Sequence, residues 1–456
     1  MSSDESAEAG TRADRISLSL NQEFVCLFDQ GDDDGPFGSH YHIVEAWRVT
    51  GPVDTDALRR ALLDVVTRHE ALRTILVRDG DEKYQKIEHA VAPQLVVRDL
   101  PDHGTSRDDL AESLIRELEA GTIDPEHPPF LRAVLARFDD RDAVLALQTH
   151  HLATDGWSVR VLIRDLANRY AAQQGCPVPG LPDAPRYQEF AVWQRTMSGT
   201  EIDAHRKYWR EKLAGARISA IPTDFPRSAA LPQLTAAHRF AVPADVASSV
   251  ARLATATRAS KPIIMLAAYA LVVAEATGSD DVVIATFTPG RGGRLFQETV
   301  GSFFNFIPLR ISVAQCRSFR DVLLRTRQTC LDAYSHDIPT LHIFAEAPDL
   351  MGPAMSDTAA AAVFQVFPDP VLLGDDTPGG LKYTEISRRP GEQVRTSATP
   401  DGMLWTLSNS PAGEILGSTV YKPNLFRADT IAAMAAQFQR SLGAAASSPD
   451  APAPRG

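Results

Sequence analysis

Apolar residues recur along this chain with two different periods, which predicts a mixture of helices and strands. Residues 58–66 and 157–170 each place their apolar side chains on one helical stripe. Residues 260–278 are apolar nearly all round, between a capping serine and a terminating glycine, so this helix is predicted to be buried. Two short apolar or β-branched runs, 143–149 and 282–287, are predicted to be strands.

The order of these elements predicts an α+β fold, a mixed α/β sandwich, because it has neither a fixed repeat nor a strict β-α-β succession. Residues 173–186 are dense in proline and glycine. They are the predicted linker between an N-terminal lobe, 15–180, and a C-terminal lobe, 181–442. Residues 1–14 are polar and residues 443–456 are rich in Ala, Pro and Ser, so both ends are predicted to be disordered.

Composition and charge narrow the class of protein. The 456 residues are about three times the ~150 of one domain, which allows two or three domains. The net charge of −12, from 46 basic and 58 acidic residues, argues against a nucleic-acid partner. No apolar stretch reaches the ~18 residues of a membrane helix, and the acidic N-terminus does not resemble a secretory signal. The four cysteines show no disulfide or metal-site spacing, so we expect a cytoplasmic protein without a membrane partner.

One histidine pair stands apart from the other histidines of the chain. His150 and His151 end a predicted strand and precede a predicted helix, with Asp155 and Gly156 in the intervening turn. Loops held by rigid elements commonly carry functional groups, and an imidazole can exchange protons near pH 7. Two solvated loop histidines are an equally ordinary interpretation of this spacing.

Other chemistries find little support in the sequence. There is no HExxH motif and no third ligand at suitable spacing, so we expect no metal site. A GxSxG nucleophile motif is missing, and so is a Walker A loop. The glycines of residues 290–293 do not form the GxGxxG pattern of dinucleotide-binding proteins.

The segment His150-His151-x-x-x-Asp155-Gly156 resembles the HHxxxDG signature of nonribosomal peptide synthetase condensation domains, which chloramphenicol acetyltransferase-like enzymes share. Further segments resemble the same family in the same order, over about residues 15–442. They are RHEALRT, DGWSVRVLIRDLANRYAA, RYQEFAVWQR, HRKYWREKLAGA, IPTDFPR, DDVVIATFTPGR and GSFFNFIPLR.

The resemblance implies two chloramphenicol acetyltransferase-like lobes, arranged as a V-shaped pseudo-dimer in a monomeric protein. It also implies that acyl- or peptidyl-carrier proteins dock on opposite faces of a channel between the lobes. Their phosphopantetheine arms would carry the substrates, and the enzyme itself would bind no cofactor. The acceptor would be an amine or an alcohol, either carrier-bound or a free small molecule, so the product would be an amide or an ester of natural-product or antibiotic biosynthesis.

The resemblance also implies roles for the signature residues. His151 would accept the acceptor's proton or stabilise the tetrahedral intermediate, and both roles stay open. Asp155 would be structural and pair with an arginine of the other lobe, for which Arg291 is the candidate. His150 would pack beneath the turn, and Gly156 would leave room for the substrate arm. The substrate channel would include Trp157 and Asn305.

Departures from the family pattern concern substrates rather than the fold. The family's usual FVNT is FFNF at residues 303–306, which places extra aromatic side chains near the channel. No carrier or adenylation motif is found, so we expect a freestanding enzyme. The alternatives are a CoA-dependent acyltransferase of the same fold and a catalytically silent docking platform for carrier proteins.

Overall fold

The computed structural model describes residues 15–31, 35–78, 82–101, 104–178, 180–197, 199–367, 379–395, 402–410 and 412–452. The predicted disorder of residues 1–14 lies outside the described residues. The chain forms two compact units, each containing a β-sheet and helices, which confirms the predicted mixed α/β class. Unit 1 comprises Met1–Ser198, Pro289–Phe304 and Val371–Ile386, and unit 2 comprises Gly199–Thr288, Asn305–Pro370 and Ser387–Gly456.

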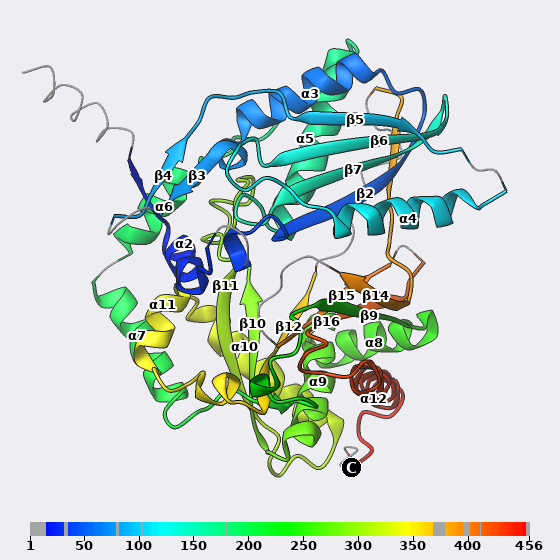
Figure 1. Cartoon of the computed structure of the whole chain (residues 1–456). Coiled ribbons are helices and arrows are strands. Elements are labelled where there is room, and N and C mark those ends of the chain that lie inside the picture. Colours follow the sequence, from blue (N-terminus) through cyan, green and yellow to red (C-terminus); the bar gives the residue numbers. More distant parts are fainter. Residues whose placement is uncertain are drawn as a thin grey trace, which may run out of the picture. The chain divides into compact units, whose positions relative to one another are not determined.

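Unit 1 is built on a five-stranded sheet (Figure 1). Its strands lie in the order β13 (Lys382–Glu385), β2 (His42–Thr50), β7 (Asp142–His150), β6 (Leu131–Asp139) and β5 (Gln94–Asp99). A small second sheet has the order β1 (Ile16–Ser17), β4 (Tyr84–Ile87) and β3 (Thr74–Val77). The helices are α2 (Leu20–Val25), α3 (Thr55–Arg68), α4 (Arg107–Ala120), α5 (Gly156–Gln173) and α6 (Tyr187–Thr196), with short 3₁₀ helices η1 (Cys26–Phe28), η2 (Gly35–Phe37) and η3 (Glu70–Arg73).

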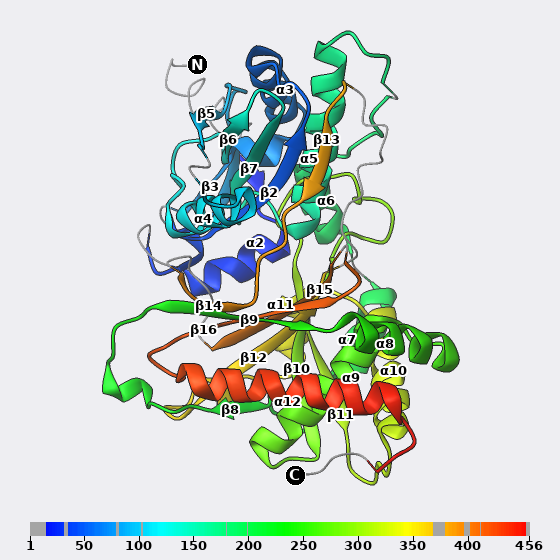
Figure 2. The same cartoon turned by 90° about the vertical axis from the view of Figure 1, so that its right-hand side faces the viewer.

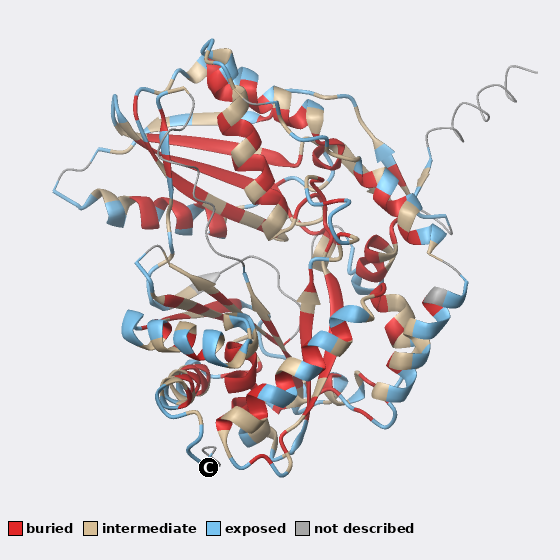
Figure 3. Ribbon diagram, turned by 180° about the vertical axis from the view of Figure 1, so that it is seen from behind, coloured by how far each residue is buried: buried red, intermediate tan, exposed pale blue. Residues whose placement is uncertain are grey.

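Both faces of the five-stranded sheet are covered, which explains why β7 has a continuous apolar sequence. Successive strand side chains point to opposite faces. Leu145 and Leu147 pack in the core formed with α3 and α5, whereas Val144 and Ala146 pack in the core formed with α4. The strands in the middle of this sheet are buried along most of their length (Figure 3). The stiff, doubly covered strand β7 ends at His150, so it fixes where the signature turn begins.

Unit 2 is built on an eight-stranded sheet (Figure 2). Its main order is β11 (Asn305–Ser312), β10 (Asp281–Thr288), β12 (Ala359–Val366), β15 (Met403–Asn409), β16 (Ile415–Tyr421), β9 (Thr235–Val242) and β14 (Gly391–Arg395), and β8 (Ala220–Pro222) pairs with β12. The helices are α7 (Thr200–Lys212), α8 (Ala244–Thr257), α9 (Lys261–Thr277), α10 (Phe319–Ser335), α11 (Thr340–Glu346) and α12 (Ala428–Ser447), with 3₁₀ helices η4 (Arg227–Ala229) and η5 (Gly352–Met355). The predicted buried helix is α9, with Ser260 as N-cap, Gly278 as C-cap and Ile264 to Val273 all buried.

The structure divides the chain differently from the predicted lobes 15–180 and 181–442. The proline-rich segment 173–186 does not separate the units, because Tyr187 and Phe190 of α6 pack in the core of unit 1. Residues 289–304 return to unit 1 through Phe296 and Phe303, and β13 returns by pairing with β2. Long-range packing of aromatic side chains therefore sets the boundary, and the composition of the linker does not.

The predicted disorder of the tail, 443–456, is wrong for residues 443–452, and residues 453–456 lie outside the described residues. Helix α12 continues to Ser447 because Phe438, Leu442 and Ala445 lie on its buried side. Beyond it, Asp450 forms an ion pair with Arg320 on α10. In Figure 2 this helix lies beside α8 and α9.

Within the described residues, no single helix is long and apolar enough to cross a membrane. Helices α8 and α9 reach that threshold only as a pair, which is bent by 106°.

Candidate functional site

The signature residues form the turn between β7 and α5 in unit 1. Asp155 is the N-cap of α5, and its carboxylate accepts a hydrogen bond of 2.7 Å from the backbone N–H of Ser158. An aspartate at this position satisfies one of the free N–H groups of the first helical turn. The backbone N–H of Ala153 donates to the carbonyl of His150, which closes the turn. Strand end and helix cap therefore hold this turn from both sides.

The two ring nitrogens of His151 differ in their hydrogen bonding. Its Nδ1 lies 2.9 Å from the carbonyl oxygen of Thr154. Because a carbonyl oxygen only accepts, Nδ1 carries the proton and Nε2 carries the lone pair in the neutral ring. No hydrogen bond from the described residues reaches Nε2. Burial lowers the pKa of His151, against the opposing effects of the Thr154 hydrogen bond and the Asp155 charge, so the ring is neutral near pH 7.

His150 is the last residue of β7, and both of its ring nitrogens are occupied. Its Nε2 donates to the carbonyl of Gly38 over 3.1 Å, and its Nδ1 accepts the backbone N–H of Leu152 over 3.3 Å. Only 1% of the residue is exposed, and burial lowers the pKa of His150 to about 4. This geometry gives His150 a place beneath the turn, as predicted, and leaves it no free nitrogen for a substrate.

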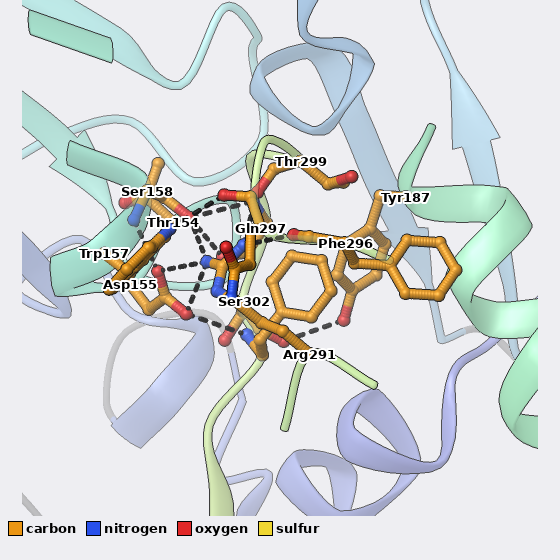
Figure 4. A network of polar contacts seen from close by, with 12 residues as sticks. Thr154, Asp155, Trp157, Ser158, Tyr187, Arg291, Phe296, Gln297, Thr299 and Ser302 are labelled. Atoms are coloured by element: carbon orange, nitrogen blue, oxygen red, sulfur yellow. Dashed lines mark hydrogen bonds and ion pairs between the residues drawn. The ribbon is translucent and has the colours of Figure 1, made fainter. Parts of the chain in front are cut away.

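The predicted ion pair between Asp155 and Arg291 is present, and both residues belong to unit 1 (Figure 4). The Arg291 Nη2 atom lies 2.8 and 2.9 Å from the two carboxylate oxygens of Asp155. Its Nη1 atom donates to the backbone carbonyls of Phe296 and Thr299. Arg291 is only 4% exposed, so the carboxylate compensates a buried positive charge. The expectation that the arginine comes from the other lobe is wrong, because residues 289–304 pack in unit 1.

Segment 289–304 is fastened to the same turn at further points. The hydroxyl of Ser158 donates to the carbonyl of Gly301 over 2.8 Å and accepts its N–H over 3.1 Å. A Cβ atom at Gly301 would lie 2.0 Å from the ring of Tyr187, so this position requires a glycine. The Tyr187 hydroxyl donates to the carbonyl of Ser302 (Figure 4). These contacts keep Arg291 next to Asp155.

The remaining predicted site residues have other surroundings. Gly156 is the first residue of α5, and Trp157 follows it with its indole N–H donating to the carbonyl of Gln297 over 2.8 Å. Asn305 lies in unit 2, where its amide donates to Asp337 and Ile338 and accepts two hydrogen bonds from Thr340. The Asn305 side chain therefore links β11 to α11 with its whole hydrogen-bonding capacity. The role of Trp157 and Asn305 in a channel stays a prediction.

One residue beside His151, Tyr41, was missed by the sequence analysis, whereas Phe304 belongs to the FFNF segment whose aromatic side chains were predicted to lie near the channel. The ring of Tyr41 stacks on His151, with centroids 4.8 Å apart, and the ring of Phe304 meets it edge-on at 6.3 Å. The sequence carries no local signal for Tyr41, because its contact with His151 depends on the pairing of β2 with β7, which places His42 opposite His150. Among the described residues, no group of three or more His, Cys, Asp or Glu side chains could hold a metal ion.

Comparisons with known proteins agree on one family. The family model "Condensation domain" matches residues 13–455. The phosphinothricin tripeptide synthetase PhsC of Streptomyces viridochromogenes is 35% identical over 405 residues, which are 86% of this chain. The chain spans only 35% of the length of that relative.

Solved structures give the same result. The SgcC5 protein of Streptomyces globisporus is 44% identical, with a TM-score of 0.91, and the match covers 96% of this chain and 100% of that one. The first condensation domain of the calcium-dependent antibiotic synthetase is 20% identical and shares the fold, with a TM-score of 0.75 over 96% of this chain and 98% of that domain.

Proposed function

The chain belongs to the condensation-domain family, and we propose that it transfers an acyl or aminoacyl group from a carrier-protein thioester to a hydroxyl acceptor. Condensation domains of peptide synthetases work with carrier-protein domains and have the chloramphenicol acetyltransferase-like fold found here. In the proposal the phosphopantetheine arm of the carrier delivers the donor, and the enzyme binds no cofactor of its own. We place the reaction in the cytoplasm and assign it to a monomer.

The observation that carries the proposal is the orientation of His151. Its protonated Nδ1 is bound to Thr154, which leaves Nε2 as the nitrogen that can accept a proton. As the acceptor oxygen attacks the thioester carbonyl carbon, its proton moves to Nε2. The tetrahedral intermediate then expels the thiol arm, and the C–S bond breaks as Nε2 returns the proton to the departing sulfur. Between these two proton transfers the ring is an imidazolium, which also stabilises the charge on the intermediate, so the base and the electrostatic roles belong to one sequence of steps.

The choice of a hydroxyl acceptor rests on SgcC5. That protein was crystallised in complex with (R)-(-)-1-(2-naphthyl)-1,2-ethanediol and sucrose. The diol carries two hydroxyl groups and an aromatic ring. Here the aromatic ring of Phe304 lies beside His151, which suits an aryl-substituted acceptor. We therefore propose that the product is an ester.

One experiment tests both halves of the proposal. A peptidyl carrier protein is loaded, in separate reactions, with acetyl and with each common aminoacyl group, and is incubated with the chain and (R)-1-(2-naphthyl)-1,2-ethanediol. Parallel reactions contain 2-amino-1-(2-naphthyl)ethanol as the matched amine, or the corresponding acyl-CoA in place of the carrier. Intact-mass analysis of carrier and product follows the transfer.

The proposal predicts that one acyl group leaves the carrier and appears on the diol as an ester. Transfer to the amine alone would overturn the ester assignment. Transfer from acyl-CoA but not from the carrier would favour the CoA-dependent acyltransferase. Absence of transfer from every donor would contradict the proposal and favour a docking platform.

A further inference from the structure

Tyr41 makes two separate contacts with His151. Its backbone carbonyl accepts the N–H of His151 over 2.9 Å. Its ring stacks on the imidazole with centroids 4.8 Å apart and an interplanar angle of 16°. One contact fixes the backbone of the histidine, and the other covers a face of its ring.

The strand register explains why these two residues meet. Strands β2 and β7 are antiparallel, and His42 lies opposite His150. One step further along the same register brings Tyr41 opposite His151, although neither belongs to a strand. Directly opposed residues of antiparallel strands have Cβ atoms about 4.5–5.5 Å apart, close enough for their side chains to interact. The position of Tyr41 therefore follows from the same strand pairing that places the signature turn.

The ring of Phe304 also lies close to the His151 imidazole. Its ring meets the His151 ring at 74° with a centroid distance of 6.3 Å. Phe304 itself packs against the small apolar cluster that contains Leu18, Val25 and Phe37. The imidazole is thus hydrogen-bonded through Nδ1 to the Thr154 carbonyl, stacked on by Tyr41 and approached by the steeply inclined ring of Phe304.

We propose that Tyr41 is a positioning residue, which holds the plane of the His151 ring so that Nε2 is aimed at the acceptor hydroxyl. The hydrogen bond from Nδ1 alone leaves the ring free to tilt about that bond, whereas the stack removes this freedom. When Nε2 takes the proton, the negative face of the tyrosine ring also attracts the imidazolium that forms. The inference rests on the proposed role of His151 and adds a residue that acts through it.

The contribution of Tyr41 comes from its ring and not from its hydroxyl. Tyr41→Phe keeps the stack and is expected to retain the transfer rate within about twofold. Tyr41→Leu keeps an apolar side chain but loses the aromatic face. A misplacement of about 1 Å in a catalytic group can cost about 100-fold, so we expect kcat to fall by roughly 10- to 100-fold. The KM for the acceptor should change by less than about threefold, because Tyr41 acts through His151.

The pH profile separates positioning from a general structural role. In Tyr41→Leu the imidazolium loses its aromatic partner while the site stays apolar. The pKa of His151 should therefore fall, and the acidic limb of the kcat/KM profile should move to lower pH. A mere loss of folded protein would lower the rate without moving this limb.

The experiment measures carrier-to-diol transfer for wild type, Tyr41→Phe, Tyr41→Leu, Tyr41→Met and His151→Asn. Thermal unfolding curves show whether each variant is folded at the assay temperature. Tyr41→Met replaces Tyr41→Leu if the latter does not fold. Wild-type kcat in the folded leucine or methionine variant would overturn the inference, and so would an equal loss in Tyr41→Phe. Full activity of His151→Asn would instead contradict the proposed role of His151, and absence of carrier-to-diol transfer by the wild type would contradict the proposed function.

Discussion

Two neighbouring histidines, one at the end of β7 and one in the turn that follows it, have opposite hydrogen-bonding environments. His150, still in the strand, has both ring nitrogens bound to backbone groups and a pKa lowered to about 4 by burial. His151, the first residue of the turn, has Nδ1 bound to Thr154 and receives no hydrogen bond at Nε2 from the described residues. An unoccupied ring nitrogen, Nε2 of His151, therefore distinguishes the candidate base from the structural histidine, His150.

Removing the negative charge of Asp155 should lower the free energy of unfolding more than the other substitutions. Asp155→Asn leaves Arg291 buried without its counter-charge, and breaking such a pair costs about 3–5 kcal/mol. We expect less soluble protein, a lower urea midpoint and a lower transfer rate. The matched control is Asp281→Asn, which breaks the more exposed pair with Arg310 and should cost at most about 1 kcal/mol. A soluble Asp155→Asn variant with an unchanged urea midpoint and no activity would show that Asp155 acts in the chemistry.

Replacing His150 should weaken the fold more than the reaction. In His150→Asn the amide can still reach the N–H of Leu152, but it leaves the carbonyl of Gly38 without its donor, a loss of about 1–3 kcal/mol. The urea midpoint should fall, while the rate per folded molecule stays within a few-fold of wild type. A rate loss as large as that of a His151 variant, at unchanged stability, would abolish the contrast between the two residues.

The stability difference between the wild type and His150→Asn should also depend on pH. Between pH about 6.5 and about 4 the unfolded chain protonates residue 150, whereas the folded protein keeps it neutral. The free energy of unfolding of the wild type therefore falls as the pH drops through this window. His150→Asn lacks this contribution, so the stability difference between the two proteins should shrink towards pH 4. A difference that is constant from pH 7 to pH 4 would contradict the buried, neutral state of His150.

The change of the wild-type transfer rate with pH should be the smallest of the predicted effects. His151 must be neutral to accept a proton, and burial lowers its pKa below the ordinary value of about 6.5. Activity should therefore persist as the pH falls from 7 and decline only below about 6.5, with the midpoint of kcat/KM on that side. A midpoint above 6.5, or the same acidic limb in the residual activity of His151→Asn, would assign the limb to another group.

Local patterns in the sequence predicted several elements well. The apolar stripes located α3 and α5, the nearly all-apolar segment 260–278 located α9, and the short apolar runs located β7 and β10. These predictions succeeded because α3 and α5 bury the face that their period defines, whereas α9 and β7 have continuous apolar runs that are buried on every side. The ion pair between Asp155 and Arg291 was predicted from the family resemblance, since nothing local connects residues 136 positions apart.

Features that depend on distant packing could not be read from local patterns. The membership of residues 289–304 in unit 1 depends on where Phe296 and Phe303 are buried. The contact of Tyr41 with His151 depends on the register between β2 and β7. The alanine-rich tail was predicted to be disordered from its composition, yet Phe438 and Leu442 anchor α12.

The most direct test of the different roles of His150 and His151 compares two matched variants, His150→Asn and His151→Asn, by single-turnover transfer from the loaded carrier to the diol. Each asparagine keeps a polar atom at the Nδ1 position and removes the Nε2 position. We expect His151→Asn to slow transfer by about 10²- to 10⁴-fold at nearly unchanged stability, whereas folded His150→Asn stays within a few-fold of wild type. Equal rates for the two variants, or full activity of His151→Asn, would show that His151 is not the catalytic base.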